Sequence, residues 1–271
     1  MTRVCSWASI FYCCYSLETL DISDWDFSVA TNVSSMFYCC YSLKQITALH
    51  LNISTNCTNT TSMFNGCLSL KELNLSNFIT TNVTNMSSMF AGCYSLRTVG
   101  NINSWNVSKV TTFESMFRYC YSLNQAFDLS NWTPSVATSI AYMFSECMSL
   151  EAFTANNWNL AKCTTMVDMF RYDYNLKTLS ISGWQLPKLT TNPGTFFASC
   201  YRLENCTGVA SPLNISFATT YCLTHQSLIN ILNELPTVST TKTITLNSYN
   251  VNRLTTAEKA IAQNKGWTIS T

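Results

Sequence analysis

One phrase returns eight times along this chain, and the spacing of its copies constrains the fold more than any single residue does. Each copy is anchored by a phenylalanine, and successive anchors are 26 or 27 residues apart. The anchors are Phe11, Phe37, Phe64, Phe90, Phe117, Phe144, Phe170 and Phe197. So steady a period is typical of stacked coils, in which each coil buries its apolar face only against its neighbours.

Fixed positions after the anchor define the inside of each coil. Three residues after it a cysteine stands in seven copies, and Asp173 replaces it in the remaining one. Six residues after it a leucine stands in all eight, usually followed by another apolar residue three positions on and often by a third two beyond. This is the L-x-x-L-x-L strand of leucine-rich repeats, in which alternate side chains point inward and outward. One short parallel strand per coil is therefore expected.

Upstream of the anchor, the apolar spacing changes from that of a strand toward that of a helix. Apolar residues recur four and seven or eight positions before the anchor, as Val83 and Met86 do before Phe90. This spacing predicts one or two helical turns on the convex side of each coil. The whole pattern predicts an α/β repeat fold, a single right-handed leucine-rich-repeat solenoid. Eight coils, the first truncated, are expected in residues 1–206.

Residues 207–271 depart from the phrase and are expected to form a transition and an α/β C-terminal capping unit. Thr224 begins a stretch of helical spacing that ends before Pro236, and Thr255 with Glu258 forms a capping box for a second helix. The expected helices cover residues 224–235 and 255–264, and the expected strands cover 243–246 and 267–269.

Two further rows in phase with the repeat are interpreted as structural. Most anchors are followed after 14 or 15 residues by an aromatic residue, namely Trp25, Phe78, Trp105, Trp132, Trp158 and Trp184. Such a row is a candidate carbohydrate-stacking ladder, but packing of the turn after the strand is favoured. The repeated cysteines are expected to be buried free thiols, because coils ~4.8 Å apart hold Cβ atoms beyond the ~3.8 Å of a disulfide. The other cysteines are candidates for oxidation.

Composition and motifs argue against several classes of function. Only 11% of the residues are charged and the net charge is +1, so attraction to nucleic acid or anionic membranes is not indicated. No stretch has the ~18 apolar residues of a membrane helix. There is no C-x-x-C pair, His50 and His225 share no ligand spacing with a cysteine, and phosphate-loop, calcium-loop and G-x-S-x-G patterns are missing. We therefore expect no enzyme, no cofactor and no metal.

Outward-facing rows are the candidate binding surfaces. The first strand row is Glu18, Lys44, Lys71, Arg97, Asn124, Glu151 and Lys177, and the second includes Gln45, Glu72 and Gln125. The basic residues of these rows form a mildly positive stripe that suits an acidic glycan or protein patch, although a solvated face without a ligand is favoured for the rows themselves. An aromatic row lies four residues after the anchors, at Tyr15, Tyr41, Tyr94, Tyr121, Tyr174 and Tyr201. Tyrosine side chains lose little conformational entropy when they bind a partner, so this row is a candidate binding surface. Stacking of the tyrosine rings on one another is the favoured interpretation.

The quoted phrase, M-F-x-x-C-x-S-L-x-x-L-x-L-S-x-W with V-T-x-M before the next M-F, resembles the BspA-type leucine-rich repeat of bacterial surface proteins and lipoproteins. The resemblance covers about residues 4–206, and residues 227–270 look like the closing unit of such proteins. It implies a non-catalytic adhesion module, at the cell surface or secreted, that binds a host or microbial protein or glycan through its concave strand face. No signal peptide, lipobox cysteine or sorting tail is recognised, a departure from that family's surface proteins.

The N-terminal residues support a second hypothesis. Val4, Trp7, Ile10 and Phe11 occupy repeat phases, so the chain begins inside a coil, whose apolar end requires cover. We expect this chain to be a fragment of a longer protein. The alternative is a structural or assembly component, for example of a phage particle and thus located in the virion. It would dock on sister subunits through its N-terminal coil.

Overall fold

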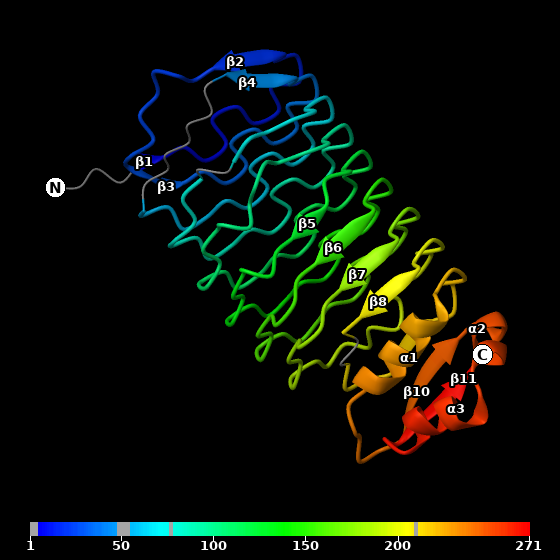
Figure 1. Ribbon diagram of the computed structural model, residues 1–271. Coiled ribbons are helices and arrows are strands. Elements are labelled where there is room, and N and C mark those ends of the chain that lie inside the picture. Colours follow the sequence, from blue (N-terminus) through cyan, green and yellow to red (C-terminus); the bar gives the residue numbers. More distant parts are fainter. Residues whose placement is uncertain (1–4, 48–54, 76–77, 209–210) are drawn as a thin grey trace.

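A computed structural model describes residues 5–47, 55–75, 78–208 and 211–271. It confirms the expected solenoid: coils stack along one axis, with β1 (Cys5–Ser6) and β11 (Trp267–Ser270) at opposite ends of the stack (Figure 1). All strand pairs are parallel, and each joins residues about one coil apart. Equivalent side chains of successive coils therefore lie next to one another, so a sequence row becomes a row in space.

The expected strand side of the coils is present. β2 (Thr19–Asp21) pairs with β4 (Gln45–Thr47), and a second sheet has the order β5-β6-β7-β8. The strands of that sheet are β5 (Phe127–Asp128), β6 (Ala152–Thr154), β7 (Thr178–Ser180) and β8 (Asn205–Thr207). Between the two sheets, a single bridge between Glu72 and Thr98 continues the pairing. The strands are only two or three residues long, so the side chains and turns carry much of the stacking.

A second parallel ladder, absent from the sequence prediction, lies before the anchors. It begins with β1 (Cys5–Ser6) and β3 (Ala30–Asn32). From Asn32 it continues as single bridges through Asn59, Asn85, Thr112, Ser139 and Thr165. Several of these side chains accept a hydrogen bond from the backbone N–H two residues on, as Asn59 does from Thr61 at 3.0 Å. The repeated Asn and Thr residues therefore shape the turn that follows each bridge.

The expected helical turns around the anchors are replaced by linked tight turns. The N–H groups of Phe37 and Cys39 donate to the carbonyl oxygens of Met63 and Asn65 in the next coil, at 2.8 and 2.7 Å. Cys39 has a φ of 57°, a left-handed value that interrupts a right-handed helix. Because alternate N–H groups bind the next coil, they cannot make helical bonds within their own. In the described part of the chain, the first α-helix starts at His225.

The core is built from stacked copies of the same side chains. Neighbouring anchor phenylalanines stack with ring centroids 5.0–5.8 Å apart from Phe11 to Phe170. The thiol of Cys67 is buried and donates to the Phe37 carbonyl at 3.2 Å. The same bond is made by Cys40, Cys93, Cys120, Cys147 and Cys200. These six are free thiols, as predicted, and burial raises the pKa of Cys93 to about 12.

The predicted aromatic row is internal from Phe78 to Trp184 and half-buried at Trp25, which confirms its structural interpretation. Trp132 is 1% exposed, and its indole N–H donates to the Ile102 carbonyl of the preceding coil at 2.9 Å. Trp105, Trp158 and Trp184 are also buried and make the equivalent bond. A buried indole has no face open to solvent, so these residues are not a carbohydrate ladder.

The C-terminal unit contains the two helices and two strands that the sequence predicts, together with a third strand, at residues 215–217, and one helix that it does not. Its elements are β9 (Ile215–Phe217), α1 (His225–Glu234), β10 (Lys242–Leu246), α2 (Ser248–Arg253), α3 (Thr256–Gln263) and β11 (Trp267–Ser270). The strands form the parallel sheet β11-β10-β9, and Thr255 and Glu258 make the expected capping box. The helix α1 lies against β8, where Ser227 Oγ donates to the Glu204 carbonyl at 2.9 Å. The unexpected helix is α2.

Candidate functional site

All ten predicted strand-row residues lie on one side of the solenoid, here called the strand face. Eight of them are exposed, and Gln125 and Lys177 are half-buried. Parallel pairing in register positions the rows, because Thr19 stands opposite Gln45 and Thr178 opposite Asn205. Glu18 and Lys44 are thereby brought onto adjacent rungs, as are Glu151 and Lys177.

Two of the four basic residues on the strand face are neutralised by those neighbours. Lys44 Nζ lies 2.7 Å from Glu18 Oε2, and Lys177 Nζ lies 3.0 Å from Glu151 Oε2. The side chains of Lys44 and Glu18 are 55% and 62% exposed, so this ion pair contributes only ~0–1 kcal/mol to stability. Its main effect is electrostatic, since it cancels the positive charge on that rung.

The other two basic residues carry uncompensated charge. Lys71 and Arg97 are exposed on adjacent rungs, and within the described residues neither has an ion-pair partner. Beside them lies an open groove of about 590 Å³, lined among others by Lys71, Glu72 and Thr98. The volume falls within the ~300–1,000 Å³ typical of ligand sites. The positive part of the strand face is therefore local rather than a continuous stripe.

The polar atoms of the Gln125 side chain already make hydrogen bonds within the protein. Its Oε1 accepts from Thr98 Oγ1 at 2.8 Å and from the Val99 N–H at 3.1 Å, and its Nε2 donates to the Gly100 carbonyl at 2.8 Å. These bonds join two coils where the regular strands are interrupted. Of the predicted rows, Gln125 is thus the residue least free to contact a partner, whereas the adjacent Asn124 is exposed.

The predicted tyrosine row is present, but it stacks in pairs rather than continuously. Ring centroids are 4.9 Å apart for Tyr15 and Tyr41, 4.7 Å for Tyr94 and Tyr121, and 5.7 Å for Tyr174 and Tyr201. Leu68 and Met148 occupy the row positions between these pairs.

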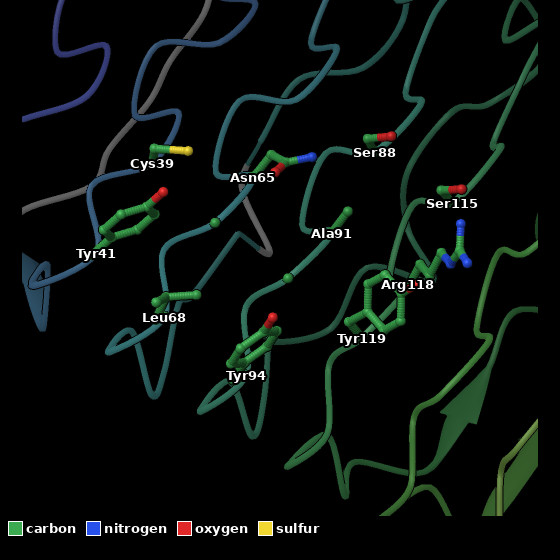
Figure 2. Close-up of a pocket in the computed structure, with 12 residues that line it drawn as sticks. Cys39, Tyr41, Asn65, Leu68, Ser88, Ala91, Tyr94, Ser115, Arg118 and Tyr119 are labelled. Atoms are coloured by element: carbon green, nitrogen blue, oxygen red, sulfur yellow. The ribbon is translucent and has the colours of Figure 1, made fainter. Parts of the chain in front are cut away.

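A pocket of about 440 Å³ lies at the first interruption, beside Leu68 (Figure 2). Sequence reasoning missed it, although Gly66 and Gly92, in two successive copies, were the signal. Its lining also includes Arg118 and Tyr119, neither of which belongs to a predicted row.

Other sequence expectations fall partly outside the described residues, including Met1 to Val4 and His50. His225 pairs with Glu258 at 3.0 Å. In the segments that the structure describes, no three His, Cys, Asp or Glu side chains are grouped as a metal would require. None of the helices described is both long and apolar enough to cross a membrane.

The fold and its surfaces define a leucine-rich-repeat solenoid of parallel strands, with regular rows of side chains on its outside. The family model described as "Mycoplasma protein of unknown function, DUF285" matches residues 1–73 and 58–184, well over half of the chain. The chain therefore belongs to this family. The family's description names no enzymatic activity.

Two solved structures show limited similarity to this chain. A leucine-rich repeat protein from Bacteroides ovatus is 14% identical, with 97% of this chain and 86% of that one covered and a TM-score of 0.31. A leucine-rich cell surface protein from Faecalibacterium prausnitzii is 18% identical, with 73% and 81% covered and a TM-score of 0.24. Such low scores carry no argument about function. No curated protein matches the sequence.

Proposed function

We propose that this chain is a non-enzymatic recognition module, displayed at the cell surface or secreted, that binds an acidic patch of a host or microbial protein or glycan through its strand face. The observation that carries the proposal is the pair of uncompensated cations, Lys71 and Arg97, between ion-paired rungs. The BspA-type resemblance of the repeat phrase supports the surface location. No nucleic acid, membrane insertion or cofactor is part of the proposal.

The charge distribution explains why these two residues are the ones expected to contact the partner. An acidic group that approaches Lys44 must compete with Glu18, which already lies 2.7 Å from the ammonium. Lys71 and Arg97 have no such competitor among the described residues. The arginine can also bind a carboxylate or sulfate through two parallel hydrogen bonds, which adds directional preference to charge.

The stacked coils favour binding because the surface is already ordered. Backbone bonds between coils fix the strand face, including Arg97 N to the Lys71 carbonyl at 2.8 Å. Binding therefore costs the conformational entropy of a few long side chains, but not that of a loop. The strand face continues over successive rungs on both sides of the groove, so an extended protein or glycan can contact more of it than a small molecule can.

The experiment compares two double variants of equal charge. Lys71→Gln/Arg97→Gln removes the uncompensated cations, whereas Lys44→Gln/Lys177→Gln removes the paired ones. Binding of the purified chain to an array of acidic glycans and extracellular proteins is measured at two salt concentrations. We expect the first variant to lose about tenfold or more in affinity and the second less than about threefold. Equal losses, or no array binding by the parent chain, would refute the proposal.

A second candidate is end-on assembly with sister subunits, favoured by the first coil. Trp7, Phe11 and Leu17 are only half-buried, while Phe37 and Leu43 of the next coil are fully buried, and Ile10 is 48% exposed. Light scattering coupled to size exclusion tests this. Oligomers that Ile10→Glu dissociates would support it, and a monomer at all concentrations would exclude it.

A further inference from the structure

The pocket beside the tyrosine row exists because two successive coils lack a side chain. In Figure 2, Tyr41, Leu68 and Tyr94 lie along one side of it, and Arg118 with Tyr119 lies at one end. Gly66 and Gly92, two positions after their anchors, also line it. A Cβ at Gly92 would make ordinary van der Waals contact with Gly66, at 3.6 Å from its Cα, so a side chain fits here without a clash.

The backbone alone does not demand glycine at these two positions. Gly66 and Gly92 have φ values of 76° and 72°, in the left-handed region. The other six coils hold positive φ at the same position with a side chain present, at Cys13, Cys39, Tyr119, Glu146, Tyr172 and Ser199. Glycine is the least strained choice there, but the repeat tolerates a tyrosine or a glutamate. The structural result particular to these two coils is the pocket.

The arginine at the end of the pocket has an instructive counterpart two coils later. Arg118 and Arg171 both directly follow their anchors. The Arg171 guanidinium donates to Asp168 Oδ2 at 3.0 Å and to Tyr172 Oη at 2.8 Å, so its charge is balanced. At the position of Asp168, the coil of Arg118 carries Ser115.

Arg118 is consequently held by aromatic rings but not by an anion. Its guanidinium carbon lies 4.5 Å from the ring centroid of Tyr119 and 4.7 Å from that of Tyr142. Among the described residues it has no ion pair, and its Nε is buried without a hydrogen-bond partner. Ring contacts fix the side chain's orientation, which lowers the entropy cost of binding an anion.

We propose that this pocket binds an acidic saccharide, a pyranose that carries a carboxylate or a sulfate. Arg118 pairs with the anion in the way that Arg171 pairs with Asp168. The ring that carries the anion packs against Tyr94, one coil from Arg118, and a linked ring packs toward Tyr41 where Leu68 interrupts the row, since aromatic rings with a polar tip accommodate both the apolar face and the hydroxyls of a sugar. The volume of about 440 Å³ suits a small ligand rather than a protein surface. This site is separate from the strand face and goes beyond the function proposed above.

The test is calorimetric titration of the whole chain with four probes: digalacturonate, a sulfated heparin-type disaccharide, neutral cellobiose and inorganic sulfate. We expect one or both acidic disaccharides to bind and cellobiose and sulfate to bind at least about tenfold more weakly. Binding of digalacturonate would show that a carboxylate suffices, whereas binding of the heparin-type disaccharide alone would assign the anion to its sulfate groups, because that disaccharide carries both anions. Sulfate binding as tight as that of the saccharides would overturn the proposal, as would binding of neither acidic disaccharide.

Two variants introduce residues that other coils carry at the same repeat position, and each variant has a matched control. Ser115→Asp recreates the pairing of Asp168 with Arg171, and Ser35→Asp places the same charge at the same phase, at a position three coils from Arg118 that does not line the pocket. Gly92→Tyr fills the pocket as Tyr119 fills its own position, and Gly92→Ser changes the backbone preference with little volume. We expect Ser115→Asp and Gly92→Tyr each to lower the affinity for the acidic disaccharide about tenfold. The controls Ser35→Asp and Gly92→Ser should each lower it less than about threefold.

Unchanged affinity in Ser115→Asp, with a normal circular dichroism spectrum, would overturn the assignment of Arg118. The strand-face variant Lys71→Gln/Arg97→Gln separates the two proposals. It should bind the disaccharide normally, so the saccharide pocket and the strand face succeed or fail independently.

Discussion

Replacing Asp173 by cysteine should stabilise the protein, because Asp173 is the one acidic residue in the internal cysteine row. Its side chain is fully buried. Oδ1 accepts from the Cys147 N–H at 2.7 Å, while Oδ2 is buried without a hydrogen-bond partner among the described residues. Burial raises the pKa of this carboxyl well above its usual range, and the Cys147 N–H only partly opposes that effect.

The expected magnitude follows from the unpaired oxygen. A buried polar atom without a partner costs ~1–3 kcal/mol, and deprotonation of the carboxyl would add to that cost. A cysteine at this phase donates its thiol to the anchor carbonyl of the preceding coil, as Cys200 does to Phe170 at 2.9 Å. Asp173→Cys should therefore raise the free energy of unfolding at pH 7 by about 1–3 kcal/mol, or a few degrees in Tm.

The pH dependence provides a second, independent signature. The folded carboxyl holds its proton more tightly than the unfolded one, whose pKa is near 3.8. The folded state is therefore favoured most below that pH, and this contribution is lost as pH rises toward the raised folded pKa. The advantage of Asp173→Cys should accordingly grow as the pH increases from about 4 to 8.

The assay is denaturant unfolding of both chains between pH 4 and 8. Asp173→Asn should show the same flattening of the pH dependence. The control Asn124→Ala, on an exposed residue without a titratable group, should leave the pH dependence unchanged. If Asp173→Cys is no more stable at pH 7, or if its advantage does not shrink toward pH 4, the carboxyl is not the penalised group and the reasoning is wrong.

Three further predictions concern other internal rows. In the native protein, a thiol reagent such as DTNB at pH 8 should modify at most five of the fourteen cysteines, because nine are buried; rapid modification of more would contradict the thiol ladder. Trp132→Phe should lower the unfolding free energy by about 1–3 kcal/mol, since it removes the indole bond to the Ile102 carbonyl, which keeps the Trp105 N–H, and leaves space beside the smaller buried ring; denaturant titration measures this. Gln125→Ala should cost about 1–2 kcal/mol, whereas the exposed neighbour Asn124→Ala should stay within about 0.5 kcal/mol. Equal effects at those two positions would show that Gln125 does not join the coils.

The inside of the solenoid was readable from the sequence because burial recurs at fixed phases. The invariant leucines, the cysteines and the tryptophans predicted the buried rows, and Thr255 with Glu258 predicted the start of α3. The turns around the anchors were predicted as helical because spacings of four and seven residues also occur in linked tight turns. What distinguishes the two is where the N–H groups bond, and spacing alone does not encode that.

The helix α2 was missed for a different reason. Its residues are mostly polar and show no apolar periodicity. It is held instead by long-range bonds, from Asn250 Nδ2 to the Thr220 carbonyl at 2.8 Å and from Arg253 Nη1 to the Leu223 carbonyl at 2.6 Å. Tertiary contacts, rather than local preference, stabilise it.

In a repeat protein, each outside position has equivalents in the other coils, so candidate sites are found where one coil departs from the rest. The strand face was predicted as a stripe, but ion pairing at Lys44 and Lys177 restricts its free charge to Lys71 and Arg97. The pocket could have been found from Gly66 and Gly92, and its unpaired arginine by comparing Ser115 with Asp168, three residues before their arginines. Such departures cost the fold little, because the backbone ladders are unaffected. Asp173 differs from its equivalents at an internal position, where we expect the difference to lower stability. Comparing Asp173→Cys with the parent chain therefore tests whether a residue that departs from the repeat costs stability at an internal position.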